Sequence, residues 1–374
     1  MNGLALQPAH FQTKRFCPFH GGFILLADCP IVGTNEALVT AGPIAAMGTS
    51  GQETLTSAFD GKERVVLSRP PAAPQLPQRR FGGTKVADLP SPVELVGDSA
   101  AAGTRPVRAC SVCRHPLPAG IDTRDPMSVS LVGHSGASKT TTLVALAEQV
   151  RQHGPALIGF DEFMPTEATA RRFRAVMGDY RHAGGSVRVT ATNELHPPLE
   201  FLAAPGRANQ PINVLFHDVA GEQLMDTDER LKTAPAVLWS DLVIYFYNPE
   251  ESPRLQLVRA GQDQAVMLNA VHDDIVEMTR YRNAWDGSPF LPPLIVLLCK
   301  ADLLPAEVAR VADQGETGVQ AAIRALGDAD VVDAGLRWPE VYWRLISAQP
   351  AGGHPPRGLV DVFDMVSRLL RERT

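Results

Sequence analysis

The chain has 374 residues, of which 44% are hydrophobic and 20% charged, and its formal net charge is -6. This length and composition predict a globular protein of two to three domains with at least one full hydrophobic core. The negative charge argues against general nucleic-acid binding, and there is no run of the ~18–20 apolar residues that a membrane span needs.

The N-terminal region carries the first cysteines. Residues 1–16 lack the apolar stretch of a secretory signal peptide, so we expect a cytoplasmic chain with reduced thiols. Cys17-Pro-Phe-His20 and Cys110-Ser-Val-Cys113 each contain two potential metal ligands separated by two residues. Such pairs suit tetrahedral Zn²⁺, because both ligands reach one ion from a tight turn. We predict a structural zinc site of these four residues, with Cys29 as a substitute for His20; ordinary reduced cysteines are the alternative.

The segment between the two cysteine pairs has a different composition. Residues 31–107 lack sustained periodicity, and their second half is rich in Pro, Gly, Ala and Ser. We interpret this segment as an insert or linker, with a few short strands in its first half. Residues 1–30 and 108–120 would then form a split zinc-ribbon-like module, and residues 121–374 a second domain.

From residue 127 onward, apolar runs alternate with helical patterns. Strands are predicted at residues 127–132, 212–216, 242–247, 294–298 and 341–346. Helices are predicted over 140–151, from Ser252-Pro253, from near Pro305 and over 359–371. The helix from Ser252 carries Leu268, Val271, Ile275 and Met278 at helical spacing. This alternation predicts an α/β fold with a mainly parallel sheet.

A glycine-rich loop follows the first of these strands. Residues 133–140 read Gly-His-Ser-Gly-Ala-Ser-Lys-Thr, the phosphate-loop pattern G-x-x-x-x-G-K-[S/T] with Ser138 in place of the second glycine. Backbone N–H groups of such a loop meet phosphate oxygens at a helix N-terminus. Lys139 is predicted to bridge the β- and γ-phosphates, and Thr140 to offer its hydroxyl to Mg²⁺. A serine side chain is tolerated at position 138 only if its φ is negative. The predicted nucleotide-binding residues here are Gly133, His134, Ser135, Gly136, Ala137, Ser138, Lys139, Thr140 and Thr141.

Three shorter motifs follow in order at predicted strand ends. Asp218-Val-Ala-Gly221 has the D-x-x-G pattern, whose Asp assists Mg²⁺ and whose Gly amide contacts the γ-phosphate. Cys299-Lys300-Ala-Asp302 is similar to [N/T]-K-x-D, in which the Asp accepts from guanine N1–H and N2–H₂ and the Lys stem covers the base. Cys299 in the first position weakens one supporting hydrogen bond. Ser347-Ala348 matches the S-A element whose backbone N–H meets guanine O6.

Together these motifs resemble a P-loop GTPase of the translation-factor-related (TRAFAC) class. More specifically, they resemble the bacterial double-GTPase-type proteins, in which a zinc ribbon precedes the G domain. The resemblance implies a three-layer G domain with a mainly parallel sheet, GTP or GDP with Mg²⁺, and hydrolysis of GTP to GDP and phosphate. It also implies a role in a bacterial conflict or defence system, with a protein partner encoded in the same operon. The partner surface is predicted on segment 252–282.

The catalytic switch residues are harder to assign from sequence. Thr190 and Thr192 are candidates for the switch threonine that meets Mg²⁺, and we favour Thr192. Glu222 stands after the D-x-x-G glycine, where a carboxylate orders water but repels the γ-phosphate. We therefore expect slow hydrolysis that needs a partner or an arginine. Arg171, Arg172, Arg174, Arg181 and Arg188 precede or flank this region, and most of them are interpreted as a solvated face.

Two other functions stay open at this point. Residues 156–160 precede Asp161-Glu162 and could form a Walker B strand of an ATPase or P-loop kinase, although they come early in the chain and leave Lys300 and Asp302 unexplained. A nucleotide-binding scaffold without turnover is the other alternative, because Ser138, Cys299 and Glu222 all depart from the GTPase pattern.

Overall fold

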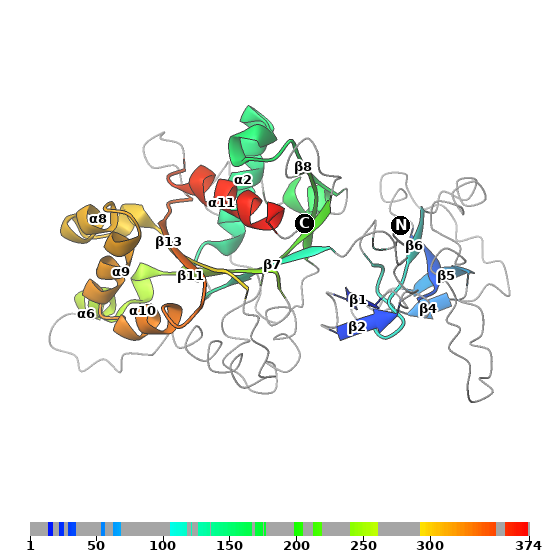
Figure 1. The fold of residues 1–374 in the computed structure, drawn as a ribbon, viewed down its shortest axis with the longest axis horizontal. Coiled ribbons are helices and arrows are strands. Elements are labelled where there is room, and N and C mark those ends of the chain that lie inside the picture. Colours follow the sequence, from blue (N-terminus) through cyan, green and yellow to red (C-terminus); the bar gives the residue numbers. More distant parts are fainter. Residues whose placement is uncertain are drawn as a thin grey trace, which may run out of the picture. The chain divides into compact units, whose positions relative to one another are not determined.

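The computed structural model describes a subset of the chain in two compact units, residues 1–126 and 127–374 (Figure 1). Every structural statement below concerns the described residues, which are 14–17, 22–25, 29–34, 54–56, 63–68, 105–117, 121, 126–134, 136–166, 169–174, 176, 198–204, 212–218, 240–260, 292–348 and 356–372.

The first unit is built from short antiparallel strands. β1 (Lys14–Cys17) and β2 (Gly22–Leu25) form a hairpin in which Cys17 lies opposite Gly22. A second sheet has the order β4-β5-β3-β6. Its strands are β3 (Ile31–Thr34), β4 (Thr54–Thr56), β5 (Glu63–Ser68) and β6 (Arg105–Arg108).

These strands include the few short strands that we expected in the first half of residues 31–107. The segment contributes four strands that pair with one another, and β6 leads directly into the Cys110 turn. The strands are only three to six residues long and lie between Gly- and Pro-rich stretches, so their period-2 pattern is too short to detect in the sequence.

The second unit contains a seven-stranded mixed sheet of order β13-β12-β11-β7-β10-β9-β8. Neighbours among β7, β10, β11, β12 and β13 are parallel, whereas β9 is antiparallel to both β10 and β8. The strands are β7 (Met127–Val132), β8 (Glu162–Pro165), β9 (Leu199–Ala204), β10 (Ile212–Asp218), β11 (Leu242–Tyr247), β12 (Leu294–Leu298) and β13 (Val341–Leu345). The five parallel strands therefore end at one edge of the sheet.

All five predicted strands are confirmed, to within two residues at their ends. They are recognisable because strands buried on both faces read as continuous apolar runs, and β7, β11 and β12 are buried along their whole length. β8 and β9 are additional strands at the sheet edge. Residues 155–158 form a 3₁₀ helix, η5 (Pro155–Ile158), where a Walker B strand was the alternative interpretation.

Helices cover both faces of this sheet (Figure 1). One core lies between the sheet and helices α2 (Lys139–His153) and α11 (Leu359–Arg371), and includes Leu143, Leu146, Val362, Phe363 and Val366. The other core packs the opposite face against α8 (Ala306–Ala312), α9 (Glu316–Ala325) and α10 (Ala329–Gly335), and includes Val308, Ile323, Val332 and Trp343. Alternate residues of β11 point into the two cores, and the result is the predicted three-layer α/β arrangement.

The predicted helices over 140–151, near Pro305 and over 359–371 are confirmed as α2, α8 and α11. α6 (Pro253–Ala260) begins at the expected Ser252-Pro253 pair, and Leu268, Val271, Ile275 and Met278 lie outside the described residues. Short 3₁₀ turns η6 (Pro249–Glu251) and η7 (Ala301–Leu303) follow β11 and β12. Among the described helices, none has the length and apolar character to cross a bilayer.

Candidate functional site

The loop between β7 and α2 has the backbone conformation of a tight strand-to-helix turn. Gly133 has φ 147° and Gly136 has φ 77°, both in the positive region that favours glycine. A side chain at Gly133 would place its Cβ 2.5 Å from the Phe246 carbonyl oxygen of β11. The loop is therefore wedged between α2 and the neighbouring strand, and glycine is required at its start. Ser135 lies outside the described residues.

Ser138 departs from the sequence expectation. Its φ is 71° and its ψ is 17°, so it is left-handed rather than negative in φ. The position keeps the conformation of the glycine that it replaces, because the following residues must begin α2 in a fixed direction: Thr142 N–H donates to the Ser138 carbonyl at 2.8 Å. The left-handed conformation costs a residue with a Cβ about 1–2 kcal/mol.

Lys139 points back over the loop. Its side chain is buried, and its ammonium group donates to the carbonyl oxygens of Gly133, at 2.5 Å, and His134, at 3.1 Å. The lysine charge is thus held above the loop, at the N-terminal end of α2. Two sources of positive potential coincide there, the ammonium and the positive end of the helix dipole.

Thr140 and Asp218 come together across 78 residues of sequence. The Thr140 hydroxyl donates to Asp218 Oδ2 at 2.6 Å. β10 ends at Asp218, which pairs with Leu131 of the adjacent parallel strand β7, so the two groups meet at the same sheet edge. A hydroxyl and a carboxylate oxygen are hard ligands of the kind that Mg²⁺ prefers.

His217, the residue before Asp218, is buried. Burial lowers the pKa of its imidazole to about 4, so the side chain stays neutral near pH 7.

A second cluster lies where β12 and β13 end. Asp302 Oδ1 accepts a hydrogen bond from the Ser347 hydroxyl at 2.5 Å. Ala301 N–H donates to the Ile346 carbonyl at 3.1 Å, which ties η7 to the end of β13. Ser347 and Arg357 exchange backbone hydrogen bonds of 3.0 and 2.9 Å. The Ser347 amide is thus used within the fold, while its hydroxyl orients the Asp302 carboxylate. Ala348 is buried beside it.

Lys300 is paired with Glu250, a residue that sequence reasoning missed. Lys300 is left-handed, with φ 50°, and its ammonium forms an ion pair with the Glu250 carboxylate. Glu250 lies in η6, directly after β11, and the two residues are 50 positions apart. No local pattern marks such a partner; only the parallel pairing of β11 with β12 brings the two strand ends together.

Cys299 is fully buried and belongs to the same core as Ala137 of the loop between β7 and α2. Its thiol donates to the Leu297 carbonyl at 3.3 Å, and its amide donates to Tyr247 O at 3.0 Å. Burial raises the pKa of Cys299, and the charges of Lys300 and Lys139 oppose that shift. The thiol therefore stays protonated. It interacts electrostatically with both Lys139 and Lys300, and it occupies the first position of the [N/T]-K-x-D motif, where Asn or Thr is usual.

Three of the four predicted zinc ligands lie close together within the described residues. Cys17, Cys110 and Cys113 are buried, and their Sγ atoms all lie within 4.8 Å of one another. The Cys17 and Cys113 sulfurs are 3.8 Å apart. Zn–S bonds of about 2.3 Å at tetrahedral angles separate two sulfurs by about 3.8 Å, so these residues fit a zinc ion.

Backbone amides around Cys110 favour the thiolate form of this residue, which is the form that binds zinc. The amides of Val112 and Cys113 point at Cys110 Sγ, at 3.3 and 3.4 Å, and so stabilise a thiolate. Arg114 follows in the left-handed region, with φ 59°. Cys29 is buried in the same small apolar cluster but is not one of the three mutually close sulfurs. His20 lies outside the described residues.

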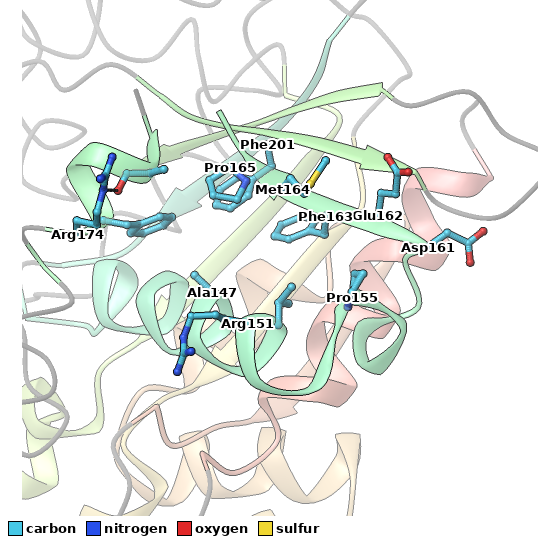
Figure 2. A pocket seen from close by; sticks show the side chains of 13 residues that line it. Ala147, Arg151, Pro155, Asp161, Glu162, Phe163, Met164, Pro165, Arg174 and Phe201 are labelled. Carbon is cyan, nitrogen blue, oxygen red and sulfur yellow. Dashed lines mark hydrogen bonds between the residues drawn. The ribbon is translucent and has the colours of Figure 1, made fainter. Parts of the chain in front are cut away.

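The Asp161-Glu162 pair lies far from the phosphate loop. Both carboxylates line a cavity of about 690 Å³ between the second half of α2, β8 and residues 170–174 (Figure 2). Its apolar lining includes Phe163, Phe173 and Phe201, with Arg174 at one end and Asp161 and Glu162 at the other. On α2 the lining begins at Ala147, about 12 Å along the helix from Lys139. The acidic pair is thus not placed to hold a phosphate-bound metal, which removes the basis of the Walker B interpretation.

Besides Ser135 and His20, the switch candidates Thr190, Thr192, Gly221 and Glu222 lie outside the described part of the chain. Neither a protein-family profile nor a curated protein sequence matches the chain. Among solved structures, it is similar to a bacterial selenocysteine-specific elongation factor, EF-Sec, with a TM-score of 0.32 and 12% sequence identity. The match covers 67% of this chain and 29% of that factor, so it spans less than a third of the factor's length.

Proposed function

We propose that the chain is a Mg²⁺-dependent GTP-binding switch that hydrolyses GTP to GDP and phosphate. One observation carries this proposal: Thr140 of the phosphate loop donates to Asp218 of a different strand, 2.6 Å away. A phosphate loop alone is a local motif, but here the threonine in the first turn of α2 contacts the aspartate at the end of β10, and a Mg²⁺–phosphate site needs such a hydroxyl and carboxylate side by side.

The phosphates would lie over the loop formed by residues 133–141. Lys139 would exchange its two carbonyl partners for phosphate oxygens, and the loop amides would bind the β-phosphate. Thr140 and Asp218 would hold Mg²⁺, with Thr192 as the proposed switch ligand. Bound Mg²⁺ supplies a positive charge that offsets the charge on the β- and γ-phosphates.

Guanine selectivity is proposed to come from Asp302. Its carboxylate accepts from Ser347 through one oxygen, and the two oxygens together still offer lone pairs to guanine N1–H and N2–H₂. Adenine has no matching pair of donors. Lys300, held by Glu250, would lie along the base, and the Ala348 amide is the proposed contact to guanine O6.

Turnover is proposed to be slow without a partner. Glu222 follows the switch glycine Gly221, and its carboxylate would repel the γ-phosphate while it orders the attacking water. Loss of the γ-phosphate would release residues 187–198 and 219–228, and segment 252–282 is the proposed partner surface. A role in bacterial defence, with a partner from the same operon, rests on the family resemblance. Cys299 and Glu222 favour a nucleotide-binding scaffold without turnover as the second candidate.

Calorimetric titration with GTP, GDP and ATP, each with Mg²⁺, tests the proposal. We expect tight binding of GTP and GDP and none of ATP, and loss of all binding in Lys139→Ala. Asp302→Ala should weaken GTP binding at least about tenfold, because a hydrogen bond to a charged group contributes about 1.5–3 kcal/mol. Asp330→Ala, at an exposed position on α10, is the matched control and should bind as the wild type does. Equal affinity for ATP, or normal binding by Lys139→Ala, would overturn the assignment.

We also propose a structural Zn²⁺ in the first unit, held by Cys17, Cys110 and Cys113. The fourth ligand is His20, or Cys29 in its place. Four protein ligands leave no open coordination position, so this metal would stabilise the fold without taking part in chemistry.

A further inference from the structure

A short helical segment, residues 169–174, is fastened across the edge of the sheet. Glu200 N–H of β9 donates to Thr169 Oγ1 at 2.8 Å, and Thr166 N–H donates to the Glu200 carbonyl at 3.0 Å. Phe173 is buried against Phe201, with ring centroids 5.8 Å apart. Two independent anchors, one polar and one aromatic, thus fix the position of this segment on β9.

The helical geometry places the arginines of the segment on different sides of the helix. Residues three and four apart share a helix face, so Arg172 lies on the same side as Thr169, whose hydroxyl is bound to β9. Arg172 is half-buried. Arg174 is exposed on another side, where its Nε donates to the Ala170 carbonyl at 3.4 Å.

The pairing of β9 with β10 places the anchored helical segment near the carboxyl end of β10. Leu199, at the start of β9, pairs with Phe216, two residues before Asp218. The anchored segment therefore lies beside the end of β10 at which Asp218 accepts from Thr140. Burial lowers the pKa of the Arg172 guanidinium, and the nearby Asp218 carboxylate opposes that shift. The anchored helix and the strand register thus bring Arg172, 33 residues after Lys139 in the chain, to the side of the sheet edge at which Asp218 lies.

We propose that Arg172 is a catalytic arginine supplied in cis, which contacts the γ-phosphate in the transition state of GTP hydrolysis. This inference rests on the proposed GTPase function. Water attacks the γ-phosphorus and a new P–O bond forms; the bond to the β–γ bridging oxygen breaks, and its electron pair stays on GDP. The proton of the attacking water ends on the released phosphate. Lys139 and Arg172 reach the site from different elements, so their charges stabilise the transferred group from two directions.

A catalytic role for Arg172 also agrees with the presence of Glu222, which departs from the GTPase pattern. With Glu222 after Gly221, the site holds one more negative charge than a site with a neutral glutamine there. A guanidinium near Asp218 would offset that charge, so the slow basal turnover would not depend on a partner's arginine. Arginines of this kind raise the rate on the order of 10³–10⁵-fold in other GTPases.

Single-turnover hydrolysis of Mg²⁺–GTP by the full-length chain tests the inference. We expect Arg172→Ala to lower the rate constant at least about 100-fold, Arg172→Lys to retain an intermediate rate, and the matched control Arg174→Ala to keep the wild-type rate. Affinity for a non-hydrolysable GTP analogue should stay within about threefold in all variants. Binding of GDP with aluminium fluoride, a transition-state mimic, should be lost in Arg172→Ala alone. Millimolar guanidinium should partly restore the rate of Arg172→Ala.

The outcomes separate the two proposals. Wild-type protein that binds no guanine nucleotide would overturn the proposed function and, with it, the inference. Wild-type protein that binds GTP but does not hydrolyse it would overturn turnover and the role of Arg172 together. A wild-type rate constant in Arg172→Ala, or equal loss of GTP, GDP and aluminium fluoride binding, would overturn the inference and leave the GTPase intact.

Discussion

Ser138 combines a left-handed backbone with a side chain that has a Cβ. At φ 71° the residue carries strain that glycine would not, and it stands at the N-cap of α2, where the phosphate loop must turn. Its hydroxyl makes no capping hydrogen bond to the helix. The strain is therefore not offset by a local cap.

Replacing Ser138 with glycine should stabilise the protein by about 0.5–1 kcal/mol. Relief of the left-handed strain exceeds the entropy that glycine gains in the unfolded chain. Urea unfolding at constant m-value measures the change. Ala137→Gly is the control: Ala137 does not have positive φ, so glycine there should destabilise. Lower stability of Ser138→Gly would show that the hydroxyl makes a compensating contact.

At the level of elements, the β7–loop–α2 unit is tightened by its contact with β11. Gly133 allows the loop to pass within contact distance of Phe246, whereas Gly136, also at positive φ, has open space around its Cβ position. Glycine is therefore required at the two positions for different reasons. At Gly133 both the positive φ and the close approach of β11 exclude a side chain, whereas at Gly136 only the positive φ disfavours one.

Alanine substitutions should separate these two reasons. Gly136→Ala should cost about 1–2 kcal/mol of stability, the cost of left-handed strain. Gly133→Ala adds a Cβ 2.5 Å from a carbonyl oxygen, so it should cost more than that and should also displace Lys139 and weaken GTP binding. Chemical unfolding and nucleotide titration of both variants check this order. Equal losses in the two would mean that the loop moves freely away from β11.

At the level of the whole molecule, the two units differ in what stabilises them. The second unit, residues 127–374, has an extensive hydrophobic core on each face of its sheet. The described core of the first unit is small. Its seven residues are Cys17, Ile24, Cys29, Cys110, Cys113, Leu117 and Ile121, of which four are cysteines. A core of this size stabilises few residues, so we expect the stability of the first unit to depend on the proposed Zn²⁺.

Zinc removal should therefore unfold one unit only. Wild-type protein should contain about one zinc per chain, and Cys110→Ser should lose it, since apparent zinc binding contributes about 10–16 kcal/mol in small zinc domains. Hydrogen exchange of residues 105–117 should rise by orders of magnitude in that variant or after chelation, while β7, β11 and β12 keep their protection. Cys299→Ser, in the core of the other unit, is the control and should retain zinc. Undiminished zinc in Cys110→Ser would remove the site.

The sequence by itself determined the features that depend on neighbouring residues. β7, β11 and β12 are buried along their whole length and appear as continuous apolar runs, and β10 and β13 also contain apolar stretches, so all five strands were predictable from the sequence pattern. The phosphate loop, the D-x-x-G aspartate and the K-x-D pair follow these strands directly, and parallel pairing then explains why they share one edge.

Contacts between distant segments were decided only by the tertiary structure. The Thr140–Asp218 bond, the Glu250–Lys300 pair and the position of Arg172 join residues separated by 46 to 78 positions, and no spacing rule links them. Ser138 was expected at negative φ, but α2 and the loop impose the opposite sign. Residues 155–158 have a strand-like composition yet form a 3₁₀ helix, because the chain must leave α2 and reach the sheet edge at β8. In each case packing between elements outweighs the local preference.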